Sequence, residues 1–250
     1  MQPKNIILNE KAHVERLLAF PSEDNVTGQN VWMVARYYNS AGYDKKKIRG
    51  LVEDFLVRSD PQCNLVQMGD MIDRAVKDSG RRQILELNSI PVTYAELKLV
   101  DELEVARERK ILFTLICLAK YSNAVSGTLN GWVNYPLKDI FYLANTYNLV
   151  KPKMYALLHD LGEQRLIGFS RRIDNTNIQV KCLNYDSDPK LQIYSFRDLG
   201  NQYLKYKGEP FFECQSCGAF TRRTNRSQRY CVECGKEINR SRAYERWLMS

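Results

Sequence analysis

Four cysteines near the C-terminus constrain the fold of this chain more than any other feature of its sequence. They form two pairs, Cys214-Gln-Ser-Cys217 and Cys231-Val-Glu-Cys234, with 13 residues between them. This spacing is typical of a structural zinc site, in which four thiolates surround one ion at about 2.3 Å. Gly218 and Gly235 follow the pairs, where a zinc knuckle favours a residue that tolerates positive φ. The pattern predicts one structural Zn²⁺. A redox dithiol and a disulfide pair are the alternatives, and both leave the repeated glycine unexplained.

The loop between the two pairs is positively charged and contains no carboxylate. Its four arginines are Arg222, Arg223, Arg226 and Arg229. From Lys205 to the end, ten Lys and Arg residues stand against five Asp and Glu, which gives +5 of the chain's net charge of +8. A small cationic module of this kind favours polyanions, above all nucleic acid. The alternative is that the arginines only solubilise a domain with almost no core.

Composition and cysteine usage bear on the compartment. The chain is 44% hydrophobic and 26% charged, which is ordinary for a globular, soluble protein. It has no run of 18 apolar residues, and its first residues lack the features of a signal peptide. Cys63, Cys117 and Cys182 are isolated from one another, and unpaired thiols beside a zinc site indicate a reducing compartment. We therefore expect a cytoplasmic protein with no membrane association.

Hydrophobic periodicity predicts a mainly α fold with small β parts, in three regions. Residues 1–88 are expected to form a helical domain, with Asp44 and Asn64 as N-caps of two of its helices. Residues 89–188 are expected to form a winged-helix domain. Residues 189–250 are expected to hold a connector and the zinc-ribbon module with its basic C-terminal tail.

The winged-helix prediction rests on the order of elements between 93 and 183. A capping box, Thr93-Tyr-Ala-Glu96, opens a first helix, and a long apolar helix follows. The remaining elements are a short strand at 131–134, helices at 137–147 and from 151, and two strands at 166–173 and 178–183. This order is typical of a winged helix, a helix-turn-helix variant. Residues 151–164 then occupy the recognition-helix position, and 171–181 form the wing.

Basic residues on the recognition helix and wing are candidate nucleic-acid contacts: Lys151, Lys153, Arg171, Arg172 and Lys181. The same helix also carries Asp160 and Glu163, so the mixture fits phosphate contacts better than reading of base edges. A winged helix that contacts only protein is the alternative.

No catalytic constellation is found in the sequence. The phosphate-binding, dinucleotide-binding and nucleophile-elbow motifs are missing, and the chain has only two histidines. A zinc ion with four cysteine ligands has no open position for water. We therefore expect no enzymatic activity and no catalytic residues.

Residues 90–234 resemble a group of uncharacterised proteins from phages and mobile elements of Gram-positive bacteria. The matching segments are Arg109–Thr114, Leu118–Tyr121, Gly131–Asn134, Ile173–Ile178, Phe196–Gly200 and the two Cys-x-x-Cys-Gly pairs. Such proteins are interpreted as winged-helix plus zinc-ribbon modules, and the resemblance implies this architecture and a mobile-element origin but no activity. Residues 30–77 are more weakly similar to the small helical domain that follows the catalytic part of some phage and plasmid primases. That catalytic part is absent here, so the implied role is an accessory one.

The leading hypothesis is a non-enzymatic nucleic-acid-binding protein of a phage or mobile element, acting in replication or transcription control. DNA is favoured over RNA, although an Arg-rich ribbon loop is also compatible with RNA. The rival hypothesis is a protein-binding adaptor or inhibitor that docks on a polymerase, a replisome or a defence complex. In that case the arginines contact an acidic partner.

Overall fold

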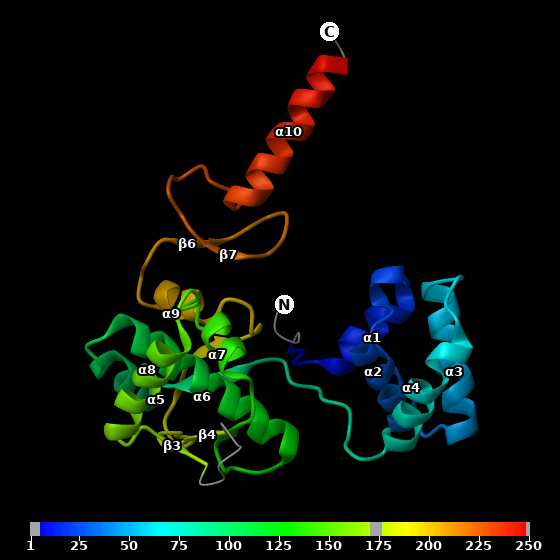
Figure 1. The fold of residues 1–250 in the computed structure, drawn as a ribbon, viewed down its shortest axis with the longest axis horizontal. Coiled ribbons are helices and arrows are strands. Elements are labelled where there is room, and N and C mark those ends of the chain that lie inside the picture. The colour runs from blue at the N-terminus through cyan, green and yellow to red at the C-terminus, as the bar shows by residue number, and fades with distance from the viewer. Residues whose placement is uncertain (1–5, 171–176, 249–250) are drawn as a thin grey trace. The chain divides into compact units, whose positions relative to one another are not determined.

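The computed structural model describes residues 6–170 and 177–248. They fall into two compact units, Ile7–Asn88 and the chain from Ser89 onward (Figure 1). The expected fold class is confirmed, because both units are mainly helical and the strands form only small antiparallel sheets. None of the helices in the described ranges combines the length and the apolar run that a membrane crossing requires.

The first unit consists of four α-helices and one short 3₁₀ segment. Their bounds are α1 Glu10–Ala19, η1 Glu23–Asn25, α2 Gly28–Ser40, α3 Lys45–Ser59 and α4 Leu65–Asp78. Asp44 and Asn64 cap α3 and α4 as predicted, since their side chains accept hydrogen bonds from amides of the first turn. The helices enclose a common apolar core that includes Val34, Phe55 and Ile72.

A buried carboxylate ties the end of the first unit back to its first helix. Glu10 accepts hydrogen bonds from Arg36 (2.7 and 2.8 Å), from Arg82 (2.6 and 3.0 Å) and from the Leu85 amide (3.1 Å). Burial acts to raise the pKa of Glu10, but the two guanidinium groups outweigh it and lower the pKa. The segment after α4 is therefore held against α1 and α2 by a compensated ionic contact.

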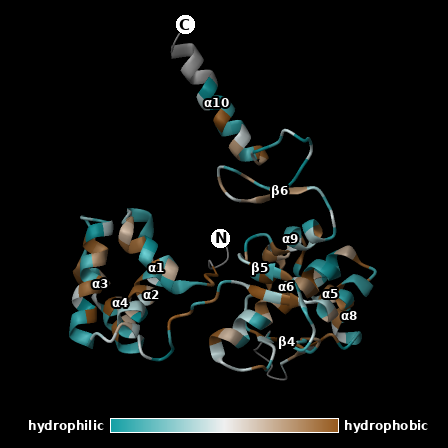
Figure 2. Cartoon of the chain, turned by 180° about the vertical axis from the view of Figure 1, so that it is seen from behind, coloured by the Kyte–Doolittle hydropathy of each residue, from teal (hydrophilic) through white to brown (hydrophobic). Residues whose placement is uncertain are grey.

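The second unit surrounds the long helix α6. Its elements are β1 Ile90–Thr93, α5 Tyr94–Glu102, α6 Ala106–Ser126, β2 Trp132–Val133, α7 Leu137–Leu143, α8 Lys151–Glu163, β3 Ile167–Phe169, β4 Ile178–Val180, β5 Pro189–Ile193, α9 Leu199–Tyr206, β6 Phe211–Glu213, β7 Phe220–Arg222 and α10 Val232–Leu248. Every residue from Ile111 to Lys120 is buried, because α5, α7, α8 and α9 all contact α6. Figure 2 shows hydrophobic residues along this helix.

The elements from α6 to β4 follow the order that the sequence predicted for a winged helix. β2, β4 and β3 form one antiparallel sheet, in which Gly168 pairs with Gln179 and Val133 with Ile178. Gly131 has a φ of 71°, and a Cβ at this position would lie 2.5 Å from the Val180 carbonyl oxygen. Only glycine fits there without a shift of the backbone. Residues 171–176, the expected wing tip with Arg171 and Arg172, lie outside the described residues.

Several element limits differ from those expected. β5, which was assigned to the connector, pairs with β1 at the start of the unit, Ile193 opposite Ile90. The expected boundary at 188/189 therefore does not separate two compact units. Helix α7 ends at Leu143 instead of 147, because Asn145 adopts a left-handed conformation (φ 51°). The basic tail forms the helix α10, which was not expected.

A buried ion pair joins β1, α5 and α6. Lys120 Nζ lies 2.7 Å from Glu96 Oε2 and donates a second hydrogen bond to the Pro91 carbonyl (2.8 Å). Glu96 also completes the predicted capping box with Thr93 and accepts a hydrogen bond from the Asn184 amide (2.9 Å). Both charged side chains are almost inaccessible to solvent, at 3% for Lys120 and 0% for Glu96.

Candidate metal centre and cationic pocket

The four cysteines converge from two elements. Cys214 and Cys217 follow β6, whereas Cys231 immediately precedes α10 and Cys234 lies in its first turn. All four sulfur atoms lie within 4.8 Å of one another, and the Sγ atoms of Cys217 and Cys231 are 3.8 Å apart. A tetrahedral ion with ligands at about 2.3 Å requires sulfur atoms about 3.8 Å apart. The four cysteines are therefore close enough to hold one metal ion.

The two pairs reach the site by different local geometry. After the first pair, Gly218 has a φ of 68°, as a knuckle requires. The same expectation for Gly235 is wrong, because Gly235 lies inside α10 without a positive φ. Cys231 immediately precedes α10, and the Cys234 amide in the first helical turn donates a hydrogen bond to Cys231 Sγ at 3.4 Å, so the two side chains converge without a residue of positive φ.

Backbone amides favour thiolate character at the first pair. The Cys231 amide donates to Cys214 Sγ at 3.2 Å. Burial acts to raise the pKa of the Cys214 thiol, but backbone hydrogen bonds at Cys217, Cys231 and Ser216 outweigh it and lower the pKa to about 6. A hydrogen bond with Ser216 acts to lower the pKa of Cys234, but the neighbouring sulfurs of Cys231 and Cys217 raise it to about 12. Metal binding at neutral pH would therefore release protons from the site.

The disulfide alternative does not fit the sulfur positions. All seven cysteines are free, and 3.8 Å between Cys217 and Cys231 is well above the 2.05 Å of an S–S bond. Cys117 lies outside the cluster, and burial raises the pKa of its thiol.

A polar joint attaches the ribbon, here residues 209–242, to the helical core. The Asp198 carboxylate accepts a hydrogen bond from the Phe220 amide, and the Asn201 side chain donates to the Phe220 carbonyl, both at 3.1 Å. Arg197 donates to the carbonyl of Cys217 inside the first knuckle. Strand β7 and the first cysteine pair are thus both anchored at the start of α9.

The same joint explains the segment Phe196–Gly200 that the resemblance singled out. Asp198, in a left-handed conformation (φ 55°), accepts a hydrogen bond from the Asn145 side chain at 2.9 Å. A Cβ on Gly200 would lie 2.0 Å from the Ala144 carbonyl oxygen. Glycine is required there because α9 approaches the backbone after α7 so closely.

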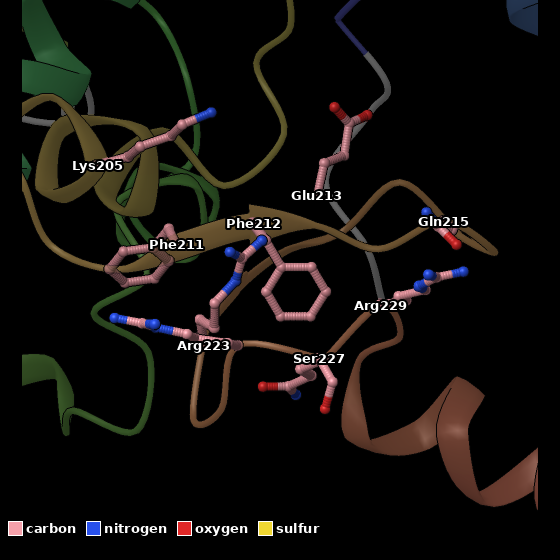
Figure 3. A pocket seen from close by; sticks show the side chains of 10 residues that line it. Lys205, Phe211, Phe212, Glu213, Gln215, Arg223, Ser227 and Arg229 are labelled. Carbon is pink, nitrogen blue, oxygen red and sulfur yellow. The ribbon is translucent and has the colours of Figure 1, made fainter.

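Three of the four loop arginines line one pocket of about 480 Å³. Figure 3 shows its side chains, with Lys205 from α9, Phe211 and Phe212 from β6, and Ser227 and Arg229 from the loop before α10. The complete lining is Lys205, Phe211, Phe212, Glu213, Gln215, Arg223, Arg226, Ser227, Gln228 and Arg229. Four cationic side chains therefore surround a pocket that contains a single carboxylate.

The fourth arginine lies elsewhere. Side chains alternate between the two faces of a strand, so Arg222 projects from the opposite face of β7 to Thr221 and Arg223. Arg222 forms an ion pair with Glu209 at 3.4 Å. The sequence did not identify Lys205 as a site residue. Its Nζ lies 4.9 Å from the Phe220 ring centroid, a contact that depends on how α9 meets the ribbon.

The basic residues of the expected recognition helix are not gathered into that pocket. Lys151 and Lys153 are exposed in the first turn of α8, and Lys151 Nζ lies 5.8 Å from the Tyr155 ring centroid. Lys181 is exposed just after β4. The face of α8 instead contributes to an apolar pocket of about 550 Å³, whose lining is Leu137, Pro152, Tyr155, Ala156, Leu158, His159, Phe169 and Ile178.

No protein-family model, curated protein or solved structure matches this chain. A fold alone does not specify an activity, so the function depends on the chemistry of these sites.

Proposed function

We propose that this chain is a non-enzymatic, zinc-stabilised nucleic-acid-binding protein that contacts its ligand, DNA in preference to RNA, through the ribbon. Four thiolates at tetrahedral spacing suit Zn²⁺, and four protein ligands leave no position for a reacting water. The ion would stabilise the ribbon rather than take part in a reaction. Without it, residues 209–242 would have few buried apolar side chains to fold around.

The observation that carries the proposal is the uncompensated positive charge of the pocket. Within the described residues, the guanidinium groups of Arg226 and Arg229 make neither an ion pair nor a hydrogen bond. In the part of the chain that the structure describes, the Arg223 guanidinium group makes no ion pair and lies over the ring of Phe212. Because these charges have no ion-pair partner that must first be displaced, a polyanion can bind them directly and release its counterions.

A salt-titrated binding assay tests this function. Fluorescence anisotropy with labelled duplex DNA, single-stranded DNA and RNA should give affinities that fall linearly with the logarithm of salt concentration. Each phosphate contact contributes a slope of about 0.9 on duplex and about 0.7 on single strands. Replacing Arg223, Arg226 and Arg229 by alanine should remove two to three phosphate contacts. The slope of log affinity against log salt concentration should then fall by about 2 log units per decade of salt. If no nucleic acid binds at low salt, the proposal is wrong.

The mobile-element origin and a role in replication or transcription control are part of the same proposal. They are supported by the resemblance of residues 90–234 to phage and mobile-element proteins and by the order of the elements from α6 to β4. On this view the winged helix contributes additional phosphate contacts through Lys151, Lys153 and Lys181.

A second function, docking on another protein, is favoured by the apolar pocket on α8. Tyr155 and Phe169 are 41% and 48% exposed beside it, at the position where a DNA-reading helix would carry polar side chains. An adaptor or inhibitor of a polymerase, replisome or defence complex would use this face. Tyr155→Ser should then abolish a stoichiometric complex that survives nuclease treatment. Tyr94→Ser, at a tyrosine on α5 that is more exposed (59%) and lies outside this pocket, should not.

A further inference from the structure

We infer that the cationic pocket of the ribbon accepts one unpaired nucleotide, so that the chain prefers single-stranded to duplex nucleic acid. The inference rests on the proposed nucleic-acid-binding function and specifies its substrate class. It follows from three features of the pocket: a stacking platform, unpaired cations and a fixed rim.

The platform is a guanidinium group held over an aromatic ring. Phe212 is buried at the centre of the ribbon, with 6% of its surface exposed, and the Arg223 guanidinium lies 5.4 Å from its ring centroid. The backbone of Arg223 is also fixed, since its amide donates to the Pro210 carbonyl at 2.5 Å. Nucleic-acid bases stack on arginine guanidinium planes as well as on aromatic rings. Arg223 therefore offers a preorganised surface for a base.

The unpaired cations supply the phosphate contacts. Arg226 and Arg229 line the same pocket as Arg223, and Lys205 approaches from α9. Glu213 is the single carboxylate in the lining, so a phosphate group would meet a strong excess of positive charge. An aromatic and cationic groove of this composition is typical of single-strand binding proteins.

The rim of the pocket is braced. The Gln228 side-chain oxygen accepts hydrogen bonds from the Thr224 amide (2.8 Å) and hydroxyl (3.0 Å), which fixes the loop carrying Arg226. A pocket of about 480 Å³ lies in the range that encloses a small ligand. Bases in a duplex are stacked and paired inside the helix, so only an unpaired base can enter a concave site.

Neighbouring arginines provide a matched test. Arg223→Ala and Arg222→Ala each remove one positive charge from β7 or the residue after it, but only Arg223 belongs to the pocket. Affinities are measured by anisotropy for a 12-nucleotide single strand, its duplex, and a strand of abasic sugar–phosphate units. We expect Arg223→Ala to weaken single-strand binding about tenfold more than Arg222→Ala, and the two variants to weaken duplex binding equally. The abasic strand should bind the unmodified chain at least roughly fivefold more weakly than the normal strand.

The outcomes separate this inference from the proposed function. If both variants lose equal affinity for every ligand, or if the abasic strand binds as well as the normal one, the contact is purely electrostatic and the nucleotide site is refuted. If no oligonucleotide binds at low salt, the proposed function itself fails. Metal content and circular dichroism check that Arg223→Ala is folded. Arg229→Ala provides a second variant that leaves the Arg223 platform in place, and because Arg229 is assigned to a phosphate it should weaken binding of the normal and the abasic strand equally.

Discussion

Replacing Lys120 by methionine tests the energetics of the core beneath the site. The substitution keeps the length of the side chain but removes the ammonium group, which lies 2.7 Å from the Glu96 carboxylate and 2.8 Å from the Pro91 carbonyl. Glu96 is fully buried and would keep hydrogen bonds only from the Thr93 and Asn184 amides. An uncompensated buried charge of this kind costs about 3–5 kcal/mol.

Native-state hydrogen exchange measures this cost in one unit of the chain. Because the middle of α6 is buried, its amides should exchange only through unfolding of the second unit. A loss of about 3–5 kcal/mol should then speed their exchange by roughly two to three and a half orders of magnitude. Amides of α2 belong to the other compact unit and should be unaffected.

A control substitution and a double-mutant cycle isolate the contribution of the Lys120–Glu96 pair. Lys98→Met removes an exposed lysine 4.0 Å from Glu102 and should cost less than about 1 kcal/mol. In a double-mutant cycle, Lys120→Met with Glu96→Gln should cost at least about 2 kcal/mol less than the sum of the single changes, because the double variant carries no buried charge. A cost below about 1 kcal/mol for Lys120→Met alone would refute the reasoning, since the carboxylate would then be solvated.

Three other outcomes follow from the described contacts. Gly200→Ala should lower the free energy of opening of α9, measured by hydrogen exchange, by about 1–3 kcal/mol, because the added Cβ would collide with the Ala144 carbonyl oxygen. Because the pKa of Glu10 is lowered in the folded state, its ionised carboxylate stabilises the first unit above pH 4.5, and this contribution should disappear as the pH falls through the folded-state pKa. Urea titrations at several pH values should show that Glu10→Gln lacks this part of the pH dependence of stability. Cys117 should react with iodoacetamide only after unfolding, because it is buried and its thiol pKa is raised; labelling in the native state would contradict this.

Local sequence patterns predicted much of the fold. The caps at Asp44, Asn64 and Thr93 lie where the sequence expected them, because an N-cap depends on residues within one turn. The cysteine cluster was predictable because the ligand spacing itself encodes the geometry.

The features that were missed depend on contacts between distant segments. The pairing of β1 with β5 joins residues about 100 positions apart, and the short β1 run contains Pro91, which argues against a strand. The joint at Asp198 requires a left-handed residue and hydrogen bonds to Asn145 and Phe220. Lys205 joins the cationic pocket only through this joint, so no local signal identified it.

Metal-dependent binding of a single strand tests the central claim most directly. The chain is stripped with a strong chelator, metal loss is confirmed by elemental analysis, and anisotropy with the 12-nucleotide strand is repeated before and after addition of one equivalent of Zn²⁺. Because the four cysteines hold the strands and loop that carry Arg223, Arg226 and Arg229, binding should be lost on stripping and restored by zinc, while amides of α2 and α6 stay protected. If the confirmed metal-free chain binds the strand with unchanged affinity, the metal does not organise the binding surface and the account is wrong.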